Sequence, residues 1–249
     1  MEPVIEVKHL KASYGKEVVL KDVSFTVNRG EIFVILGGSG SGKSTVLRHL
    51  LALEESTGGS IRINGTLINP DKDLFKQLYS QVGVLFQGGA LFGSMSLAEN
   101  IALPLQTYTR LDKKSIDDVV RMKLRMVNLE GYENHLPSEL SGGMQKRAGI
   151  ARALAMSPPM LFLDEPSAGL DPITAAELDD LILNFNKSLG MTIVVVTHDL
   201  GSILKVGQRC IMLDKKEKGI IAEGDPRELK ATSTNPIVHS FFNREVLKT

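Results

Sequence analysis

The chain carries the stretch Gly37-Gly38-Ser39-Gly40-Ser41-Gly42-Lys43-Ser44-Thr45 between an apolar run at residues 31–36 and a helix-compatible segment at residues 46–51. This is the pattern G-x-x-x-x-G-K-[ST] in the strand, loop and helix setting that a phosphate-binding loop requires. Its glycines allow backbone N–H groups to turn inward around phosphate oxygens, and the following helix adds the positive end of its dipole. The stretch therefore predicts a site for nucleotide phosphates; the alternative is a glycine- and serine-rich linker with a chance lysine.

All nine residues of this loop are candidate nucleotide contacts, and two of them have specific predicted roles. Lys43 supplies a point charge to the β- and γ-phosphates, which also makes it a catalytic candidate. Ser44 carries a hydroxyl that can bind Mg²⁺. The loop by itself identifies neither the nucleotide nor the process that its binding drives.

A second nucleotide element is predicted where the apolar run at residues 160–163 ends in Asp164 and Glu165. A short apolar run ending in acidic residues is typical of a buried strand whose carboxyl end opens onto the ligand crevice of an α/β sheet. Because side chains alternate along a strand, Asp164 can hold the magnesium shell while Glu165 faces a water in line with the γ-phosphate. Glu165 is therefore the candidate general base. The alternative is a solvated pair of acids at the end of a strand.

A third element, Ser141-Gly142-Gly143, precedes a segment at residues 146–154 with a pattern that favours a helix. Ser141 can act as the N-cap, and the two glycines leave backbone N–H groups approachable at the helix N-terminus. Since a triphosphate in the first loop already has its local amides, a second amide cradle suggests a composite site closed by another subunit. Taken alone, Ser-Gly-Gly would be an ordinary capped turn.

With these three elements in order, the chain resembles the ATP-binding cassette family, whose signature sequence is L-S-G-G-Q. Here Met144 precedes the glutamine, Gln145, and this departure follows the Ser-Gly-Gly that contacts phosphate. The resemblance implies that the chain hydrolyses ATP with Mg²⁺ as a pair of identical copies. Each phosphate loop then faces the Ser141-Gly142-Gly143 of the other copy; ATP binding closes the pair and hydrolysis reopens it.

The same resemblance implies four more site residues. Tyr14 falls where the family stacks an aromatic ring on adenine, and Gln87 matches the glutamine that links magnesium to the transporter contact. Asp171 matches the loop that meets the partner copy. His198 matches the histidine that contacts the γ-phosphate and joins Gln87 among the catalytic candidates. Taken singly, Tyr14 could be a surface aromatic, Gln87 a turn residue and His198 a strand-end imidazole.

The resemblance covers nearly the whole chain and implies an α/β fold. This is a P-loop NTPase (RecA-like) core with an antiparallel β subdomain and an inserted α-helical subdomain, in one nucleotide-binding domain over residues 1–249. Strand patterns at 4–7 and 23–27 and a hairpin signal at Asn64-Gly65 predict an antiparallel edge layer. From about 90 to 155 the strand signal drops and helical spacing appears, which predicts the helical lobe. We interpret Met122 and Met126 within it as core residues.

The C-terminal tail, from about residue 225 to 249, carries two adjacent aromatic residues, Phe241 and Phe242. Because terminal residues fray unless they are held, we expect these rings to pack on something. Packing on the chain's own domain and packing on a neighbouring ATPase both remain open.

Composition narrows the class of protein. The 249 residues contain 29 basic and 29 acidic side chains with no long block of like charge, so no electrostatic footprint for nucleic acid or an anionic membrane is present. Cys210 is the single cysteine and adjoins an apolar run, which indicates a buried structural thiol and a reducing cytoplasm. Neither a signal peptide nor a run long enough to span a bilayer is seen, so membrane association is expected through partners.

Less specific segments indicate the transport subclass. Residues 86–100, 103–105, 140–144 and 168–174 look like the MlaF-type ATPases of bacterial Mce-associated phospholipid transporters. That resemblance implies a peripheral protein on the cytoplasmic face of the inner membrane, with two integral-membrane permease subunits and an Mce-domain lipid-binding protein as partners. It also implies that the permease docks on an apolar patch after Gln87, for which Leu91, Phe92 and Met95 are candidates. The alternatives are the ATPase of an amino-acid-type importer and a non-transport member acting on DNA or ribosomes.

Overall fold

The strands build one mixed sheet in the computed structural model, which describes residues 2–68 and 80–245. Within those ranges ten strands hydrogen-bond in the order β5-β4-β1-β2-β10-β9-β3-β8-β7-β6. Their bounds are β1 Pro3–Tyr14, β2 Glu17–Asn28, β3 Ile32–Gly37, β4 Gly58–Ile63, β5 Thr66–Leu67, β6 Val82–Leu85, β7 Met160–Asp164, β8 Thr192–Val196, β9 Arg209–Asp214 and β10 Gly219–Gly224.

The strands β9, β3, β8, β7 and β6 run parallel and form the centre of the molecule. Their sequences are almost continuously apolar because both faces of a parallel sheet are covered. Alternate residues enter two separate cores: Val34 and Leu161 face one, whereas Phe33 and Phe162 face the other. The strands predicted at residues 31–36 and 160–163 are confirmed, within one residue at their ends.

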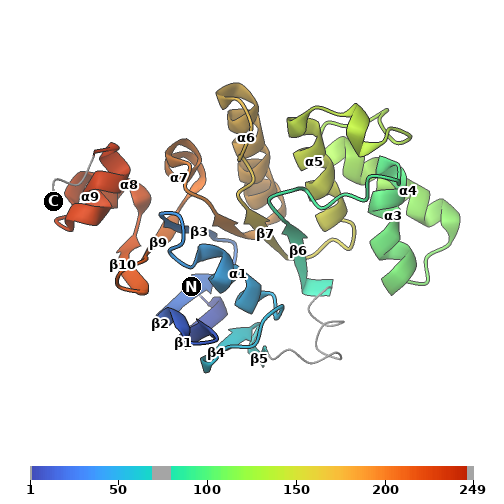
Figure 1. Cartoon of the computed structure of the whole chain (residues 1–249). Helices are drawn as coiled ribbons and strands as arrows, with labels where there is room; N and C mark the ends of the chain where they lie inside the picture. Colours follow the sequence, from blue (N-terminus) through green and yellow to red (C-terminus); the bar gives the residue numbers. More distant parts are fainter. Residues whose placement is uncertain (1, 69–79, 246–249) are drawn as a thin grey trace.

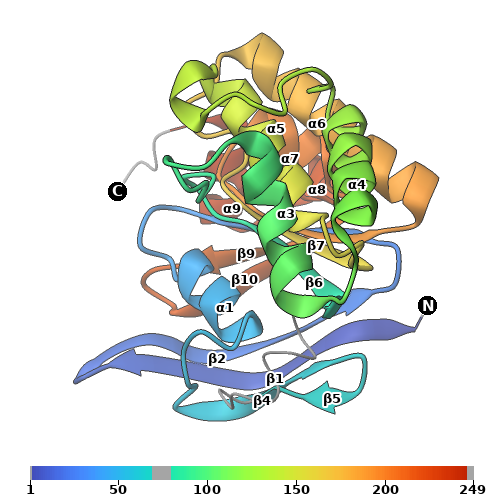
Figure 2. The same ribbon diagram turned by 90° about the vertical axis from the view of Figure 1, so that its right-hand side faces the viewer.

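An antiparallel layer formed by β1, β2, β4 and β5 lies along one side of this sheet, as predicted. The turn between β4 and β5 is Asn64-Gly65, whose φ angles are 47° and 77°. Two successive positive φ angles are the geometry that Asn-Gly favours in a tight hairpin. Figure 2 shows this layer beneath the parallel strands, with α1 (Lys43–Leu50) between the two.

Helices cover the opposite face of the parallel strands (Figure 1). Their bounds are α3 Leu97–Tyr108, α4 Lys113–Met126, α5 Gly142–Ala153, α6 Pro172–Leu189, α7 Leu200–Val206, α8 Pro226–Thr232 and α9 Pro236–Asn243, with a 3₁₀ turn at Pro137–Glu139. Between Leu97 and Ala153 the structure contains helices and no strand. The division of the chain into subdomains at about 90–155 and about 225–249 stays a prediction.

The interpretation of Met122 as a core residue was wrong. Its exposed fraction is 48%, whereas Met126 on the same helix is half-buried and packs against the larger core. Ile116, Val120 and Leu124 form the apolar face of α4. Met122 is two residues from Val120 and from Leu124, which puts it on the opposite side of the helix. Helical spacing of apolar residues therefore located the helix but overestimated the width of its buried stripe.

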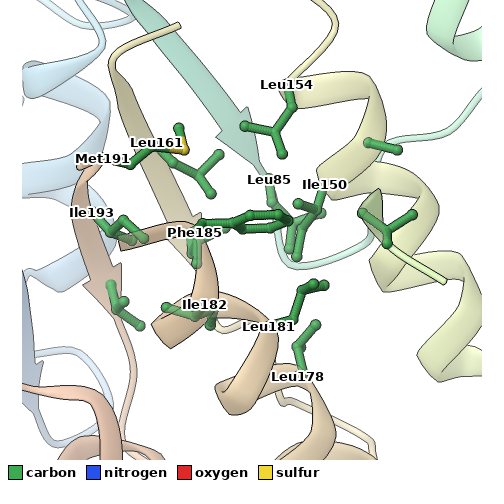
Figure 3. Close-up of a cluster of buried hydrophobic side chains, with 14 of the residues drawn as sticks. Leu85, Ile150, Leu154, Leu161, Leu178, Leu181, Ile182, Phe185, Met191 and Ile193 are labelled. Atoms are coloured by element: carbon green, nitrogen blue, oxygen red, sulfur yellow. The ribbon is translucent and has the colours of Figure 1, made fainter. Parts of the chain in front are cut away.

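The helix α5 is anchored directly on the sheet. Figure 3 shows Ile150 of α5 and Leu154, the residue that follows this helix, facing Leu85 of β6. Phe185 of α6 lies between them and Leu161 of β7. All five side chains are buried. Because protein interiors are close-packed, this contact fixes α5 relative to the carboxyl ends of β6 and β7.

The tail packs on its own chain as far as the described residues extend. Val238 and Phe242 of α9 are buried in the same core as α5 and α6, and the Phe241 ring meets the Phe242 ring edge-on at 5.5 Å. Cys210 is also buried, as predicted, and burial raises the pKa of its thiol to about 12. Within residues 2–68 and 80–245, no helix combines the length and apolar character that crossing a membrane requires.

Candidate nucleotide site

Four neighbouring parallel strands bring most of the predicted site residues to one edge of the sheet. Gly37 ends β3 and starts the phosphate loop, and His198 follows β8 closely. Asp164 ends β7, and Gln87 follows β6 closely. Since β6, β7, β8 and β3 are parallel neighbours, their carboxyl ends open at the same edge, where α/β sheets bind ligands.

The phosphate loop has a backbone that glycine makes accessible. Gly42 adopts φ 98° immediately before α1, in the left-handed region that favours glycine. At Gly37 a Cβ atom would lie 2.4 Å from the carbonyl oxygen of Leu213, so a side chain there would displace the neighbouring strand. The loop is thus both turned by glycine and packed closely against β9.

The N-terminus of α1 differs in its capping from those of α3 to α9. Gly42 precedes α1 and no side chain accepts a hydrogen bond from its first amides. In contrast, helices α3 to α9 each have a side-chain cap from Ser, Asp or Asn. Uncapped amides at a helix N-terminus, in a glycine-rich loop, are suited to binding phosphate oxygens.

The Lys43 ammonium lies over this loop. Its Nζ donates hydrogen bonds to the carbonyl oxygens of Gly37 and Gly38, at 2.9 and 3.1 Å. Burial lowers the pKa of Lys43, while the negative charges of Glu165 and Asp164 oppose that shift. Lys43 thus places its cation between the phosphate loop and the two acids at the end of β7.

Glu165 and His198 form a contact pair. Glu165 Oε1 lies 2.8 Å from His198 Nδ1, and Glu165 Oε2 accepts a hydrogen bond of 3.2 Å from the Thr197 hydroxyl. The Glu165 backbone has φ 46°, in the left-handed region, and its N–H donates to Val196 of β8. Two residues predicted from separate motifs are therefore adjacent, and Thr197 is a third member that the sequence analysis did not identify.

Asp164 lies beside Glu165 and faces three cations. Burial raises the pKa of Asp164 and the Glu165 charge raises it further, whereas Arg48, Lys43 and Lys146 lower it. One oxygen of Asp164, Oδ1, is buried and has no hydrogen-bond partner among the described residues. A buried oxygen of this kind is normally satisfied by water or an ion.

These residues fit Mg²⁺ bound with a nucleotide. Magnesium prefers oxygen ligands and in phosphate sites takes one or two protein groups together with phosphate oxygens. The Asp164 carboxylate, the Ser44 hydroxyl and the Gln87 side-chain amide are the groups that would hold it. Ser41 Oγ, buried in the phosphate loop, is also without a hydrogen-bond partner within the described ranges.

Tyr14 ends β1 and is half-exposed. Its hydroxyl donates a hydrogen bond to Glu54, which also pairs with Arg48 at 3.3 Å. Arg48 is on α1, so these contacts connect Tyr14 to the helix that follows the phosphate loop. Stacking of its ring on adenine stays a prediction.

The remaining predicted residues lie together on a different surface of the chain. Ser141 caps α5, as predicted, by accepting from the Met144 N–H, and Asp171 caps α6 by accepting from Thr174. A Cβ built at Gly143 would lie 2.3 Å from Thr174 Cγ2. The N-termini of α5 and α6 are therefore packed directly against each other. In Figures 1 and 2 α5 lies away from α1. One chain therefore holds Ser141-Gly142-Gly143 and Asp171 as one unit separate from its own phosphate loop.

Replacing Gly143 with alanine should disrupt this unit. Because the new Cβ would overlap Thr174, the N-termini of α5 and α6 would have to separate. We expect at least about a tenfold loss of kcat for ATP hydrolysis, since small displacements near a reacting group cost one to two orders of magnitude. The Kd of the monomer for ATP should stay within about threefold, measured by fluorescence titration against the matched variant Gly93→Ala, whose Cβ would meet nothing within 4 Å. Equal kcat values for the two variants would contradict the expectation.

Lys146 was missed by the sequence analysis, although it contacts two of the site's loops. It lies on α5, and its Nζ donates to the Gln87 carbonyl oxygen and lies 3.5 Å from that of Glu165. The spacing of the sequence places Lys146 on the same face of α5 as two glycines, because it is three residues from both Gly143 and Gly149. Both glycines are buried on the packed face of the helix. A lysine on such a face is unusual and indicates a specific partner.

Comparisons with known proteins show which family the chain is similar to. The family described as "ABC transporter" matches residues 20–168. The "Probable ribonucleotide transport ATP-binding protein mkl" of Mycobacterium leprae is 42% identical over 244 residues, which are 98% of this chain and 70% of that protein; for the protein of the same name in Mycobacterium bovis the latter share is 66%. The "Methionine import ATP-binding protein MetN" of Clostridium tetani is 38% identical over 91% of this chain and 70% of that protein.

Solved structures are similar over most of the chain. The structure described as "Dimeric structure of a post-hydrolysis state of the ATP-binding cassette MJ0796 bound to ADP and Pi" superposes with a TM-score of 0.80 and 33% identity. The superposition covers 89% of this chain and 98% of that one. The fold class predicted from the sequence is thereby confirmed.

Proposed function

Since this chain belongs to the ATP-binding cassette transporter family and is an ATP-hydrolysing member of it, we propose that it powers phospholipid transport through separate permease subunits. Two copies act together on the cytoplasmic face of a bacterial inner membrane, where the protein is peripheral. An Mce-domain lipid-binding protein completes the assembly.

The observation that carries the ATPase mechanism is the convergence of four loops at one edge of the sheet. The loops after β3, β6, β7 and β8 supply a cation, an amide, two acids and an imidazole within one region. Phosphoryl transfer needs mainly positioning and charge stabilisation, together with a group that orients the attacking water. This edge offers all of these from residues of one chain.

The residues of this edge divide the proposed hydrolysis between them. The amides at the start of α1 and the Lys43 ammonium bind the β- and γ-phosphates. Glu165 accepts a proton from the water that attacks the γ-phosphorus, which yields ADP and phosphate. His198, 2.8 Å from Glu165, orients that carboxylate and contacts the γ-phosphate. When bound, Mg²⁺ neutralises charge on the β- and γ-phosphate oxygens.

The second copy supplies the other half of each site. The unit formed by Ser141, Gly142, Gly143 and Asp171 presents helix N-termini away from the chain's own phosphate loop, and Ile173 beside it is 75% exposed. Triphosphate oxygens that satisfy amides of both copies hold the pair closed, and loss of the γ-phosphate removes that bridge. The similar MJ0796 cassette is described as a dimer, which supports this arrangement.

The permease is proposed to dock in an apolar groove between α3, the end of α5 and the turn after α1. The groove has a volume of about 270 Å³. Its lining includes Leu53, Phe86, Pro104, Tyr108 and Met156. The candidates from the sequence, Leu91, Phe92 and Met95, are not part of this lining, and Leu91 packs against the core. Phe92 stays a candidate contact, because it is exposed and lies against Arg152, which lines the groove.

The proposed cargo, phospholipid, rests on the resemblance to the MlaF-type ATPases. Relatives with 37–42% identity carry names that give different cargoes, among them ribonucleotide, glycine betaine and methionine. The resemblance of residues 86–100 and 168–174 to the MlaF-type ATPases supports phospholipid. The amino-acid-type importer remains the second candidate because of the similarity to the methionine and glycine betaine proteins.

Purification from membranes tests the groove and the cargo together. A tagged chain extracted in mild detergent from its own cells should bring down a multi-spanning membrane protein in about equimolar amount, with phospholipid identified by mass spectrometry. Leu53→Arg places a charge in the groove and should reduce this recovery at least about tenfold, since burying an unpaired charge costs several kcal/mol. Leu189→Arg changes another exposed leucine, at the end of α6, and should leave recovery unchanged.

Both variants should keep the ATPase activity of the free chain, because neither residue touches the sheet edge. Equal recovery from the two variants would exclude the groove as the docking site. A substrate-binding protein and amino acid in place of phospholipid would favour the importer, and recovery of nucleic acid without a membrane protein would contradict transport.

A further inference from the structure

Lys146 is a charged side chain buried on the packed face of α5. Its exposed fraction is 8%, and its Nζ donates to the Gln87 carbonyl oxygen and lies 3.5 Å from the Glu165 carbonyl oxygen. Those carbonyl groups belong to the two loops that carry the proposed magnesium ligand and the proposed general base. One ammonium group on α5 therefore joins both loops.

Burial of this ammonium group is unfavourable unless its environment compensates. Burial lowers the pKa of Lys146, and the negative charges of Asp164 and Glu165 act in the opposite direction. The neighbouring glycines, Gly89 and Gly149, allow the Gln87 loop to lie against the helix: a Cβ at Gly149 would be 3.0 Å from the Gly89 oxygen. The local packing is thus arranged around a close approach between α5 and this loop.

The same helix holds the loop at a second point. Arg152 donates a hydrogen bond to the carbonyl oxygen of Ala90, and its guanidinium lies 5.9 Å from the centre of the Phe92 ring. Ala90 has φ 50°, a conformation that needs support from its surroundings. Lys146 and Arg152 therefore fix both ends of the segment 87–90, and Arg152 also lines the apolar groove proposed for the permease.

Lys146 has one further connection, to the turn after β7. The Glu165 carbonyl oxygen that it approaches also accepts a hydrogen bond of 3.1 Å from the Ala168 N–H. That turn leads into Asp171, whose capped helix α6 packs against Gly143. Lys146 thus lies where the chain's own hydrolytic loops meet the unit proposed to face the partner copy.

We propose that Lys146 is a positioning residue for ATP hydrolysis, which holds the Gln87 loop and the Glu165 turn against α5 so that both reach their working positions together. This inference rests on the proposed function, since Gln87 and Glu165 have their hydrolytic roles only there. The lysine acts through backbone carbonyl groups and does not itself contact the nucleotide.

Lys123 provides a matched control within the chain. It is the other buried lysine of the described residues, with an exposed fraction of 4%, and burial lowers its pKa as well. Lys123 lies on α4, and its Nζ donates a hydrogen bond of 2.9 Å to the Ser157 hydroxyl. Neither residue belongs to the loops at the carboxyl edge of the sheet. Replacing either lysine with methionine removes one buried charge and one donor, but only Lys146→Met releases the site loops.

Steady-state ATPase assays of the full-length variants test the proposal. For Lys146→Met we expect kcat to fall about 10- to 100-fold while KM for ATP changes less than about threefold, because misplaced catalytic groups lower kcat by this order. Lys146→Arg keeps donors and charge and should restore kcat to within about fivefold of wild type. Lys123→Met should lower Tm but leave kcat within about twofold. Amide exchange should increase in residues 87–90 and 165–168 only in Lys146→Met.

Three outcomes would overturn the proposal: a kcat of Lys146→Met near wild type, equal losses in Lys146→Met and Lys123→Met, or no recovery in Lys146→Arg. Should Lys146→Met fail to fold, Lys146→Gln, which keeps an N–H donor without the charge, is measured against the same criteria. A Glu165→Gln variant distinguishes failure of the proposed function from failure of the role proposed for Lys146. Wild-type turnover in Glu165→Gln contradicts the proposed function itself, whereas loss there with full activity in Lys146→Met contradicts only the role of the lysine.

Discussion

Glu165→Gln is expected to lower kcat for ATP hydrolysis by about 10³-fold while leaving ATP binding intact, a loss in the range that removal of a general base produces. Glutamine keeps the size of glutamate and can still accept a hydrogen bond from the Thr197 hydroxyl. It cannot take a proton from water at neutral pH. The nucleotide would therefore bind and close the pair, but the reaction that reopens it would stop.

Two measurements check this expectation together. Phosphate release gives kcat, and size-exclusion chromatography with ATP and Mg²⁺ should show a stable dimer of the variant where the wild type elutes as a monomer after turnover. The matched control is Glu177→Gln, an exposed glutamate on α6 whose loss should change neither quantity. Wild-type turnover in Glu165→Gln would show that another group is the base, and a variant that never dimerises would remove the second copy from the mechanism.

The phosphate loop and the acids after β7 could be predicted because each depends on local sequence. Gly42 is needed for φ 98°, and a run such as residues 160–163 can be recognised as a buried strand from its composition. The edge at which they meet follows from a general rule, since parallel strands have their carboxyl ends together. No pairing of particular strands had to be known for that step.

Other features depended on contacts between distant segments and could not be predicted. Thr197 and Lys146 join the site because β8 lies beside β7 and α5 lies across the end of β6, and neither fact is visible in a local pattern. The apolar groove is similar: Leu53, Phe86 and Tyr108 come from three elements and become neighbours only in the folded chain. Met122 shows the converse, since a local pattern predicted a core position for a side chain whose exposed fraction is 48%.

The second large effect is expected from Lys43→Ala, which should weaken binding of ATP itself. The ammonium group is within hydrogen-bond distance of the Gly37 and Gly38 carbonyl oxygens, so it is already positioned over the loop that receives the phosphates. A hydrogen bond to a charged group contributes about 1.5–3 kcal/mol, which corresponds to roughly a 10- to 150-fold rise in the Kd for ATP. Turnover at saturating ATP should fall as well, since the charge also stabilises the γ-phosphate as its bond breaks.

A nearby lysine separates a specific contact from a general effect of positive charge. Lys215 is exposed on the turn after β9, and its Nζ would lie 3.8 Å from a Cβ built at Gly40 of the phosphate loop. Lys215→Ala removes the same charge from the same neighbourhood, but screening at physiological salt should limit its effect on the Kd to about threefold or less. If both variants bind ATP with the affinity of the wild type, Lys43 is not the phosphate ligand. If both lose affinity equally, the loop attracts the nucleotide through its overall charge, and the close fit of the Lys43 ammonium to the loop does not determine binding.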